Sequence, residues 1–152
     1  MRRTVLQTDD HSFKRSYAVF LHTDLNNCLG IVSLFPWFKD GPFEPLLGMA
    51  KAKAESTWET AYLYKREAWG KGIGTEALQT AIASFAKERT GKDTTLVAIT
   101  NTENPGTHRV MEKSEFVCQG PLELGKGKVW VGGAWRDELV LVWSRSIPAG
   151  HT

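Results

Sequence analysis

The sequence is poor in the residues that usually hold metals. Its two cysteines, Cys28 and Cys118, lie far apart and neither belongs to a CxxC pair. We therefore expect each to pack as a small apolar residue rather than to ligate a metal or form a disulfide. The four histidines are scattered without the spacing of metal ligands. No metal cofactor is expected.

The sequence also lacks a strong charge imbalance and a long apolar run. Its 19 basic and 17 acidic residues leave a net charge of +2, with no basic stripe interleaved with aromatic residues, so nucleic acid is not an expected partner. No apolar run approaches the roughly 20 residues of a membrane helix, and the basic N-terminus lacks the apolar segment of a signal peptide. The default expectation is a cytosolic or nuclear protein, and we favour the cytoplasm.

What is present is one domain's length of alternating strand and helix signals, taken as a single domain over residues 1–152. Strands are expected at 17–22, 28–35, 57–64, 94–100, 116–124, 128–131 and 135–143, and helices at 75–88 and 105–113. This order predicts a mixed α/β layer fold. Residues 36–56 hold three prolines and two glycines and are expected to form a long loop.

A glycine-rich segment separates the strand at 57–64 from the helix at 75–88; it reads Trp69-Gly70-Lys71-Gly72-Ile73-Gly74-Thr75. Glycines let backbone N–H groups point at a ligand, and the helix N-terminus adds partial positive charge, so the segment is expected to bind an anion. A P-loop would need glycine at Lys65 and Ser or Thr at Gly72, and a Rossmann motif would need glycine at Thr75. What remains is a shorter phosphate cradle.

Two segments carry a resemblance to a known family. AYLYKREAWGKGIGTEALQ resembles the acetyl-CoA-binding motif of the GNAT N-acetyltransferases, and NPGTHRVMEKSEF, residues 104–116, resembles the helix that follows in that family. The combination is most similar to the ribosomal-protein N-terminal acetyltransferase branch. The resemblance implies a central, mostly antiparallel sheet with a splayed strand pair, flanked by helices. It also implies a shortened N-terminal strand and helix element, reduced to an edge strand such as residues 4–7.

The resemblance implies a role for each matching residue. Leu63 and Tyr64 would pair their backbone with the pantetheine arm of acetyl-CoA, and Asn104 would hydrogen-bond pantetheine besides serving as a helix N-cap. The pyrophosphate would bind the cradle, whose matching residues are Trp69, Gly70, Lys71, Gly72, Gly74 and Thr75. Thr107 stands where this branch usually has a serine close to the CoA sulfur, and it would help the thiolate leave.

The chemistry requires an oxyanion site and a base. A backbone N–H on the splayed strand would stabilise the charged carbonyl oxygen. A base must remove the ammonium proton, directly or through water, and Glu59 on that strand is our candidate. Two positions depart from the family pattern. Met111 replaces a tyrosine that serves as general acid, and Glu115 replaces a glycine, so we expect that turn to be built differently.

We therefore predict an N-acetyltransferase that passes the acetyl group of acetyl-CoA directly to a primary amine, either a protein N-terminus or a small amine. The loop at 36–56 would form a wall of the acceptor pocket. The alternative is an acetyl-CoA-binding or CoA-binding module without catalysis, and a third reading is a phosphate-binding module for another nucleotide. If the N-terminal element is short, exposed apolar edges would favour a homodimer.

Overall fold

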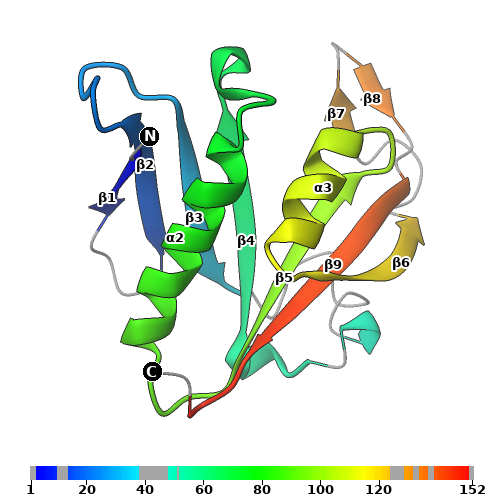
Figure 1. Cartoon of the computed structure of the whole chain (residues 1–152). Helices are drawn as coiled ribbons and strands as arrows, with labels where there is room; N and C mark the ends of the chain where they lie inside the picture. Colours follow the sequence, from blue (N-terminus) through cyan, green and yellow to red (C-terminus); the bar gives the residue numbers. More distant parts are fainter. Residues whose placement is uncertain are drawn as a thin grey trace.

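The fold is built on one seven-stranded sheet in the order β1-β2-β3-β4-β5-β9-β6 (Figure 1). The structure is a computed structural model that describes residues 3–9, 14–37, 48–50, 52–123, 129–131, 134–136 and 139–150. The strands of the sheet are β1 (Arg3–Asp9), β2 (Arg15–Leu21), β3 (Gly30–Pro36), β4 (Thr57–Tyr64), β5 (Thr94–Asn101), β6 (Val117–Glu123) and β9 (Leu139–Ile147). A separate hairpin contains β7 (Val129–Val131) and β8 (Ala134–Arg136).

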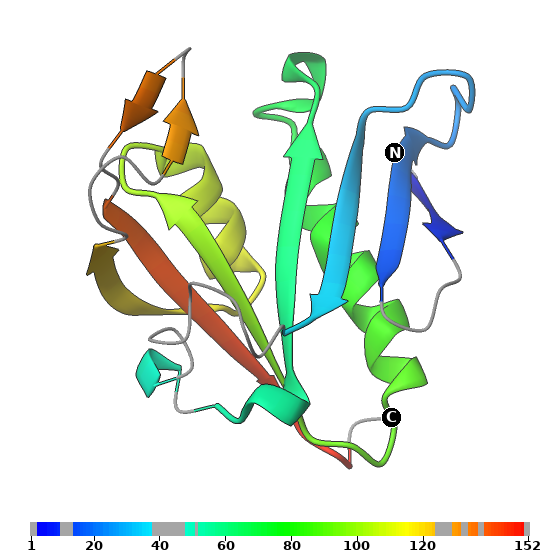
Figure 2. The ribbon, with the colours of Figure 1, turned by 180° about the vertical axis from the view of Figure 1, so that it is seen from behind.

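The central feature of the sheet is its parallel strand pair. All other neighbours in the sheet are antiparallel, but β4 and β5 run parallel and pair only where Thr57–Glu59 meets Thr95–Val97. Beyond Glu59, β4 continues to Tyr64 on β3 alone, and the two strands separate (Figures 1 and 2). The predicted mostly antiparallel sheet with a splayed strand pair is confirmed, with β1 as an edge strand.

The helices Ile73–Glu88 and Pro105–Lys113 lie on the same face of the sheet (Figures 1 and 2). The longer helix, α2 (Ile73–Glu88), buries one apolar stripe against the sheet, as its 3.6-residue periodicity predicts. Its Phe85 ring meets the Trp58 ring of β4 edge-on at 4.8 Å between centroids. The shorter helix, α3 (Pro105–Lys113), begins with proline at its first position, where the missing N–H costs nothing.

One strand prediction is wrong. We expected a single strand at 135–143, but β8 ends at Arg136 and β9 begins at Leu139. β8 pairs with β7, whereas β9 pairs with β5 and β6, so the chain passes from the small hairpin to the main sheet between them. An apolar run does not indicate which neighbour each part will pair with. Most of the predicted loop at 36–56 lies outside the described residues, which include 3₁₀-helix η1 (Ala54–Ser56).

The turn after α3 uses a left-handed backbone residue. Glu115 has a φ of +66°, its N–H donates to the carbonyl of Glu112, and the N–H of Phe116 donates to the carbonyl of Met111 at 3.0 Å. This is a Schellman motif, in which glycine is the usual left-handed residue. The turn is therefore built as glycine would build it, contrary to our expectation. The chain accepts a backbone penalty at Glu115, whose carboxylate pairs with Arg145 at 3.1 Å.

This penalty can be measured with two variants that both remove the ion pair. We expect Glu115→Gly to be more stable than Glu115→Ala by about 1 kcal/mol, because only alanine retains the cost of a left-handed backbone. The free energy of unfolding of both variants should lie within about 1 kcal/mol of the wild type, since an exposed ion pair contributes little. Urea denaturation of the three proteins measures the difference. Equal stability of the glycine and alanine variants would contradict the left-handed conformation.

Candidate functional site

A cavity of about 440 Å³ opens where β4 separates from β5. Its walls are the end of β4, the turn before α2, the first turn of α2 and one face of α3. The predicted site residues that line it are Leu63, Tyr64, Trp69, Gly70, Gly72, Gly74, Thr75, Asn104 and Thr107. We call this cavity the cleft. The tertiary structure thus brings residues from two separate sequence motifs into one site.

The cradle gets its shape from two left-handed glycines. Gly70 and Gly72 have φ values of +70° and +74°, and a Cβ at either would meet nothing within 4 Å. Glycine is therefore needed at these positions for the backbone conformation and not for space. Gly72 is the N-cap of α2, whose first-turn N–H groups have no partner within the helix. Together with the helix dipole, these N–H groups make the cradle a suitable anion site.

The Tyr64 side chain fixes the cradle to β4. Its hydroxyl donates to the carbonyl of Gly74 at 2.9 Å, and the Trp69 indole donates to the Tyr64 carbonyl at 3.1 Å. Two glycines make room for this arrangement. A Cβ at Gly74 would come within 2.9 Å of the Tyr64 ring, and a Cβ at Gly30 would come within 2.5 Å of both that ring and the Leu63 carbonyl. Tyr64 is thus held by close packing on both sides.

The contact at Gly30 predicts a large effect on stability. We expect Gly30→Ala to lower the free energy of unfolding by about 2–3 kcal/mol, because the new methyl group meets backbone that cannot move without shifting β4. Gly150→Ala is the matched control, since its Cβ would meet nothing within 4 Å and its φ is not positive. Thermal denaturation followed by circular dichroism measures both. A Gly30→Ala protein as stable as the control would contradict the described packing of β3 on β4.

Helix α3 presents Asn104 and Thr107 to the cleft. The Asn104 side chain accepts a hydrogen bond from the Thr107 N–H at 3.2 Å, so Asn104 is the N-cap that the sequence predicted. This bond occupies the amide oxygen and fixes the side chain at the edge of the cleft. The binding role of Asn104 toward pantetheine stays a prediction.

Two predicted residues do not line the cleft. Lys71 belongs to the cradle but is not among the lining residues, and neither is Glu59. Glu59 is the last β4 residue that pairs with β5, and it faces the side of the sheet opposite to Trp58 and Tyr64, which contact α2. Burial raises the pKa of the Glu59 carboxyl. A desolvated carboxylate at the base of the strand separation is suited to accept a proton.

Six residues that line the cleft had no predicted role, and three of them carry a hydroxyl or a positive charge. Arg109 and Lys113 stand one helical turn apart on α3, and Tyr62 stands two residues before Tyr64 on the same face of β4. In the sequence, the four-residue spacing of Arg109 and Lys113 already indicated that both lie on one face of the helix. The two-residue spacing of Tyr62 and Tyr64 likewise indicated that both side chains lie on the same face of the strand. The two basic side chains add positive charge to the α3 wall of the cleft.

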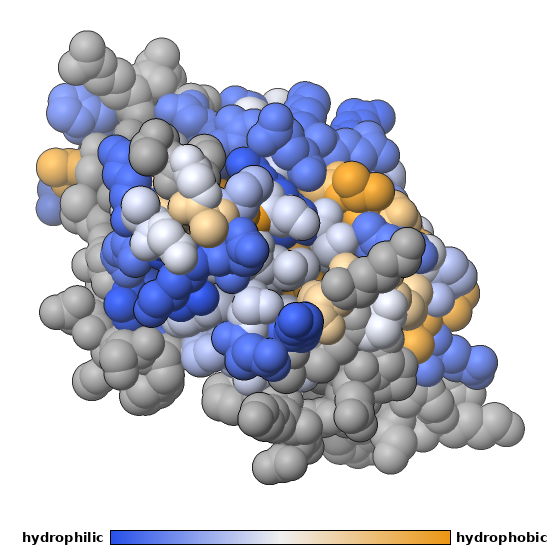
Figure 3. Space-filling model, turned by 90° about the horizontal axis from the view of Figure 1, so that it is seen from below, coloured by the Kyte–Doolittle hydropathy of each residue, from blue (hydrophilic) through white to orange (hydrophobic). Residues whose placement is uncertain are grey.

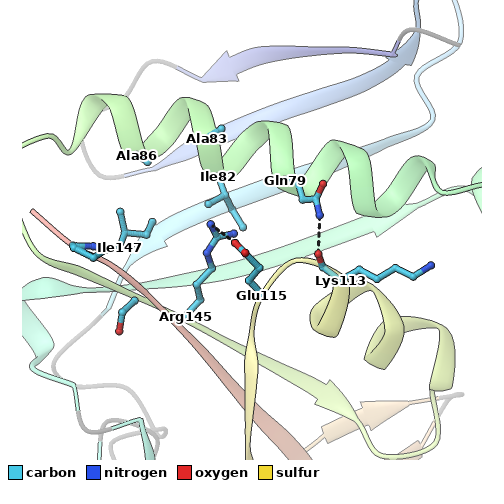
Figure 4. A pocket seen from close by; sticks show the side chains of 10 residues that line it. Gln79, Ile82, Ala83, Ala86, Lys113, Glu115, Arg145 and Ile147 are labelled. Carbon is cyan, nitrogen blue, oxygen red and sulfur yellow. Dashed lines mark hydrogen bonds and ion pairs between the residues drawn. The ribbon is translucent and has the colours of Figure 1, made fainter. Parts of the chain in front are cut away.

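A second cavity of about 400 Å³ lies between α2, the end of α3 and β9 (Figure 4). Three of its polar side chains form an ion pair or bond to nearby backbone. Arg145 pairs with Glu115 and donates to the Ser114 carbonyl at 3.0 Å, while Gln79 donates to the Lys113 carbonyl at 2.7 Å. These contacts hold the end of α3 against α2 and β9. The second cavity therefore supports the position of α3 and has no predicted site residue in it.

Within the described ranges, no three His, Cys, Asp or Glu side chains gather closely enough to hold a metal ion. No helix in these ranges combines the length and apolar character needed to cross a membrane. Seen from below, the described surface is largely hydrophilic, with apolar side chains in smaller patches (Figure 3). Two of the exposed large apolar residues, Leu63 and Trp69, line the cleft.

Solved structures resemble this fold at low sequence identity. The ribosomal-protein-S5-alanine acetyltransferase from Vibrio fischeri has a TM-score of 0.66 and 18% identity, over 93% of this chain and 66% of that chain. The RimL ribosomal L7/L12 alpha-N-protein acetyltransferase, in complex with coenzyme A, has a TM-score of 0.62 and 19% identity, over 90% of this chain and 64% of that chain. Mycobacterium smegmatis RimJ, in complex with a CoA-disulfide, has a TM-score of 0.62 and 20% identity, over 90% of this chain and 54% of that chain.

The chain thus spans 54% to 66% of the length of these three proteins, and the likeness shows a shared fold. No curated protein matches the sequence. The family model of the acetyltransferase (GNAT) domain matches residues 1–117, which include the splayed strands, the cradle and α3. The chain therefore belongs to the GNAT acetyltransferase family.

Proposed function

We propose that the protein binds acetyl-CoA in the cleft and transfers its acetyl group directly to a primary amine. The observation that carries this proposal is the coincidence of a separated parallel strand pair and a glycine cradle in one cavity. The alternative is a module that binds CoA or acetyl-CoA without catalysis. Both readings require the same cofactor site.

The cleft offers complementary groups for two parts of acetyl-CoA. The N–H groups at the start of α2 would receive the pyrophosphate, assisted by the positive charge of Arg109 and Lys113. Beyond Glu59, the edge of β4 that faces β5 is not paired with it, so the backbone of Leu63 and Tyr64 would pair with the pantetheine amides. Asn104 would add a side-chain hydrogen bond from α3. Trp69, Lys71, Gly70, Gly72, Gly74 and Thr75 complete the proposed cofactor site.

The reaction needs a free amine and a stabilised oxyanion. Glu59 would take the ammonium proton, and because it does not line the cleft, a water molecule would relay the proton to it. Its raised pKa makes it a stronger base than an exposed glutamate. A backbone N–H of β4 would stabilise the charge on the carbonyl oxygen. Thr107 would hydrogen-bond the departing sulfur.

The acceptor is proposed as either a protein N-terminus or a small amine. Two of the similar solved structures are ribosomal-protein acetyltransferases, which supports the first class. We propose a cytoplasmic location because such acceptors are found there. A homodimer stays a prediction that light scattering at micromolar concentration will test.

Two measurements test the proposed function. Isothermal titration of acetyl-CoA into the protein should show binding, while ATP and NAD should not compete. Release of the CoA thiol should then follow on addition of an amine from a panel of N-terminal peptides and small amines. Binding without turnover on any amine would favour the non-catalytic alternative. No binding of acetyl-CoA to the folded protein would overturn both.

A further inference from the structure

Tyr62 carries a buried hydroxyl in the cleft that the proposed function has not used. Its side chain lines the cleft, yet among the described residues its hydroxyl has no hydrogen-bond partner. Tyr64, two residues further along the same face, donates a hydrogen bond from its hydroxyl to the Gly74 carbonyl. A buried hydroxyl without a partner costs free energy, so phenylalanine would serve the packing of this position better than tyrosine.

The neighbours of Tyr62 fix its ring and keep its hydroxyl as a hydrogen-bond donor in the cleft. Its ring stacks on the Tyr64 ring at 4.9 Å between centroids and 27° between planes, which fixes its orientation. Burial raises the pKa of the Tyr62 phenol, and the Thr107 side chain of α3, which lies beside the hydroxyl, offsets only part of this rise. The hydroxyl therefore stays protonated at neutral pH and acts as a donor. Met111, at 1% exposure, lies in the core and offers no hydroxyl.

The position of Tyr62 along β4 matches the reactive end of the proposed cofactor. The cradle lies beyond one end of β4, and Glu59 lies three residues before Tyr62, about 10 Å away at the rise of a strand. A thioester that extends from phosphates in the cradle toward Glu59 must pass Tyr62 and Thr107. These two side chains approach each other from opposite walls of the cleft.

We propose that Tyr62 is a catalytic residue whose hydroxyl donates a hydrogen bond to the thioester sulfur of acetyl-CoA. The inference rests on the proposed function. Once the ammonium proton has passed through water to Glu59, the free amine nitrogen attacks the carbonyl carbon and forms the C–N bond. The second nitrogen proton leaves to solvent as the amide forms. The C–S bond then breaks, and its electron pair leaves on sulfur, where the Tyr62 hydrogen bond stabilises the charge. Tyr62 keeps its own proton, and the thiolate takes a proton from solvent.

Tyr62→Phe tests this role because it removes only the hydroxyl. We expect kcat to fall about 100-fold, at the lower end of the loss for one donor to developing charge, with the Kd for acetyl-CoA changed less than about threefold. Stability should be unchanged or higher, since the lost hydroxyl had no partner. Tyr17→Phe is the matched control, because Tyr17 on β2 also has a buried hydroxyl without a described partner and does not line the cleft.

A second readout needs no acceptor amine. The pKa of the thiol of bound CoA is measured by the ultraviolet absorbance of its thiolate. We expect this pKa to be lower in wild type and Tyr17→Phe than in Tyr62→Phe by about one unit, a tenfold change in the thiolate equilibrium.

The outcomes separate this inference from the proposed function. Equal thiol pKa values in wild type and Tyr62→Phe, or an unchanged kcat, would overturn the role of Tyr62 while leaving acetyl-CoA binding intact. Should Tyr62→Phe fail to fold, the wild type alone decides: a bound thiol with the pKa of free CoA, or a higher one, overturns the proposal. A wild type that does not bind CoA at all would overturn the proposed function as well.

Discussion

Replacing Gly72 with glutamate is expected to weaken acetyl-CoA binding at least 100-fold. Gly72 is the N-cap of α2 and lines the cleft, so the new carboxylate would stand where the pyrophosphate is proposed to bind. Two like charges about 4 Å apart repel by about 1 kcal/mol in bulk water and by about 4 kcal/mol near a protein surface. The side chain would also occupy part of the cradle. Isothermal titration of acetyl-CoA measures the loss directly.

The backbone cost of this substitution has its own control. Gly72 has a φ of +74°, so any side chain at this position destabilises the folded protein by about 1–2 kcal/mol. Gly91 has a φ of +85°, equal room for a Cβ and no place in the cleft, which makes Gly91→Glu a matched variant. It should lose similar stability and keep full binding. A Gly72→Glu protein that binds acetyl-CoA as tightly as Gly91→Glu would rule out the cradle as the phosphate site.

Replacing Glu59 with glutamine is expected to lower kcat by about 100- to 1,000-fold, the usual contribution of a general base. Burial raises the pKa of the Glu59 carboxyl. As the pH is lowered, the wild-type rate should therefore begin to fall at a higher pH than it would if the base were an exposed glutamate. The variant should lose this pH dependence and keep its affinity for acetyl-CoA. Glu55→Gln, which changes an exposed carboxylate of η1, should behave as wild type. A wild-type pH profile retained by Glu59→Gln would exclude Glu59 as the base.

The same substitution should make the protein more stable at neutral pH. A carboxyl whose pKa is raised on folding binds its proton more tightly in the folded state. Its contribution is therefore favourable at low pH and is lost as the pH rises through the folded pKa. Glu59→Gln removes that loss, so its advantage should be largest near pH 7 and smallest near pH 4. Urea denaturation at the two pH values measures it. An advantage that grows at low pH would contradict the burial of Glu59.

The sequence by itself determined features that depend on neighbours along the chain. The alternation of Thr57–Tyr64 predicted β4 with its correct bounds, and the apolar stripe of 75–88 predicted most of α2. Asn104 followed by Pro105 predicted the start of α3. The glycines before α2 predicted the cradle, because left-handed backbone and helix-end N–H groups are local properties.

The tertiary structure decided which of these features meet. The pairing of β4 with β5 ends at Glu59, which opens the cleft, and Glu59 itself does not line it. The packing of α3 brings Thr107 to Tyr62. At Glu115, the Schellman turn imposes a left-handed backbone that a glutamate does not favour by itself. Such features depend on contacts between residues far apart in the chain, and local patterns carry no information about where those contacts fall.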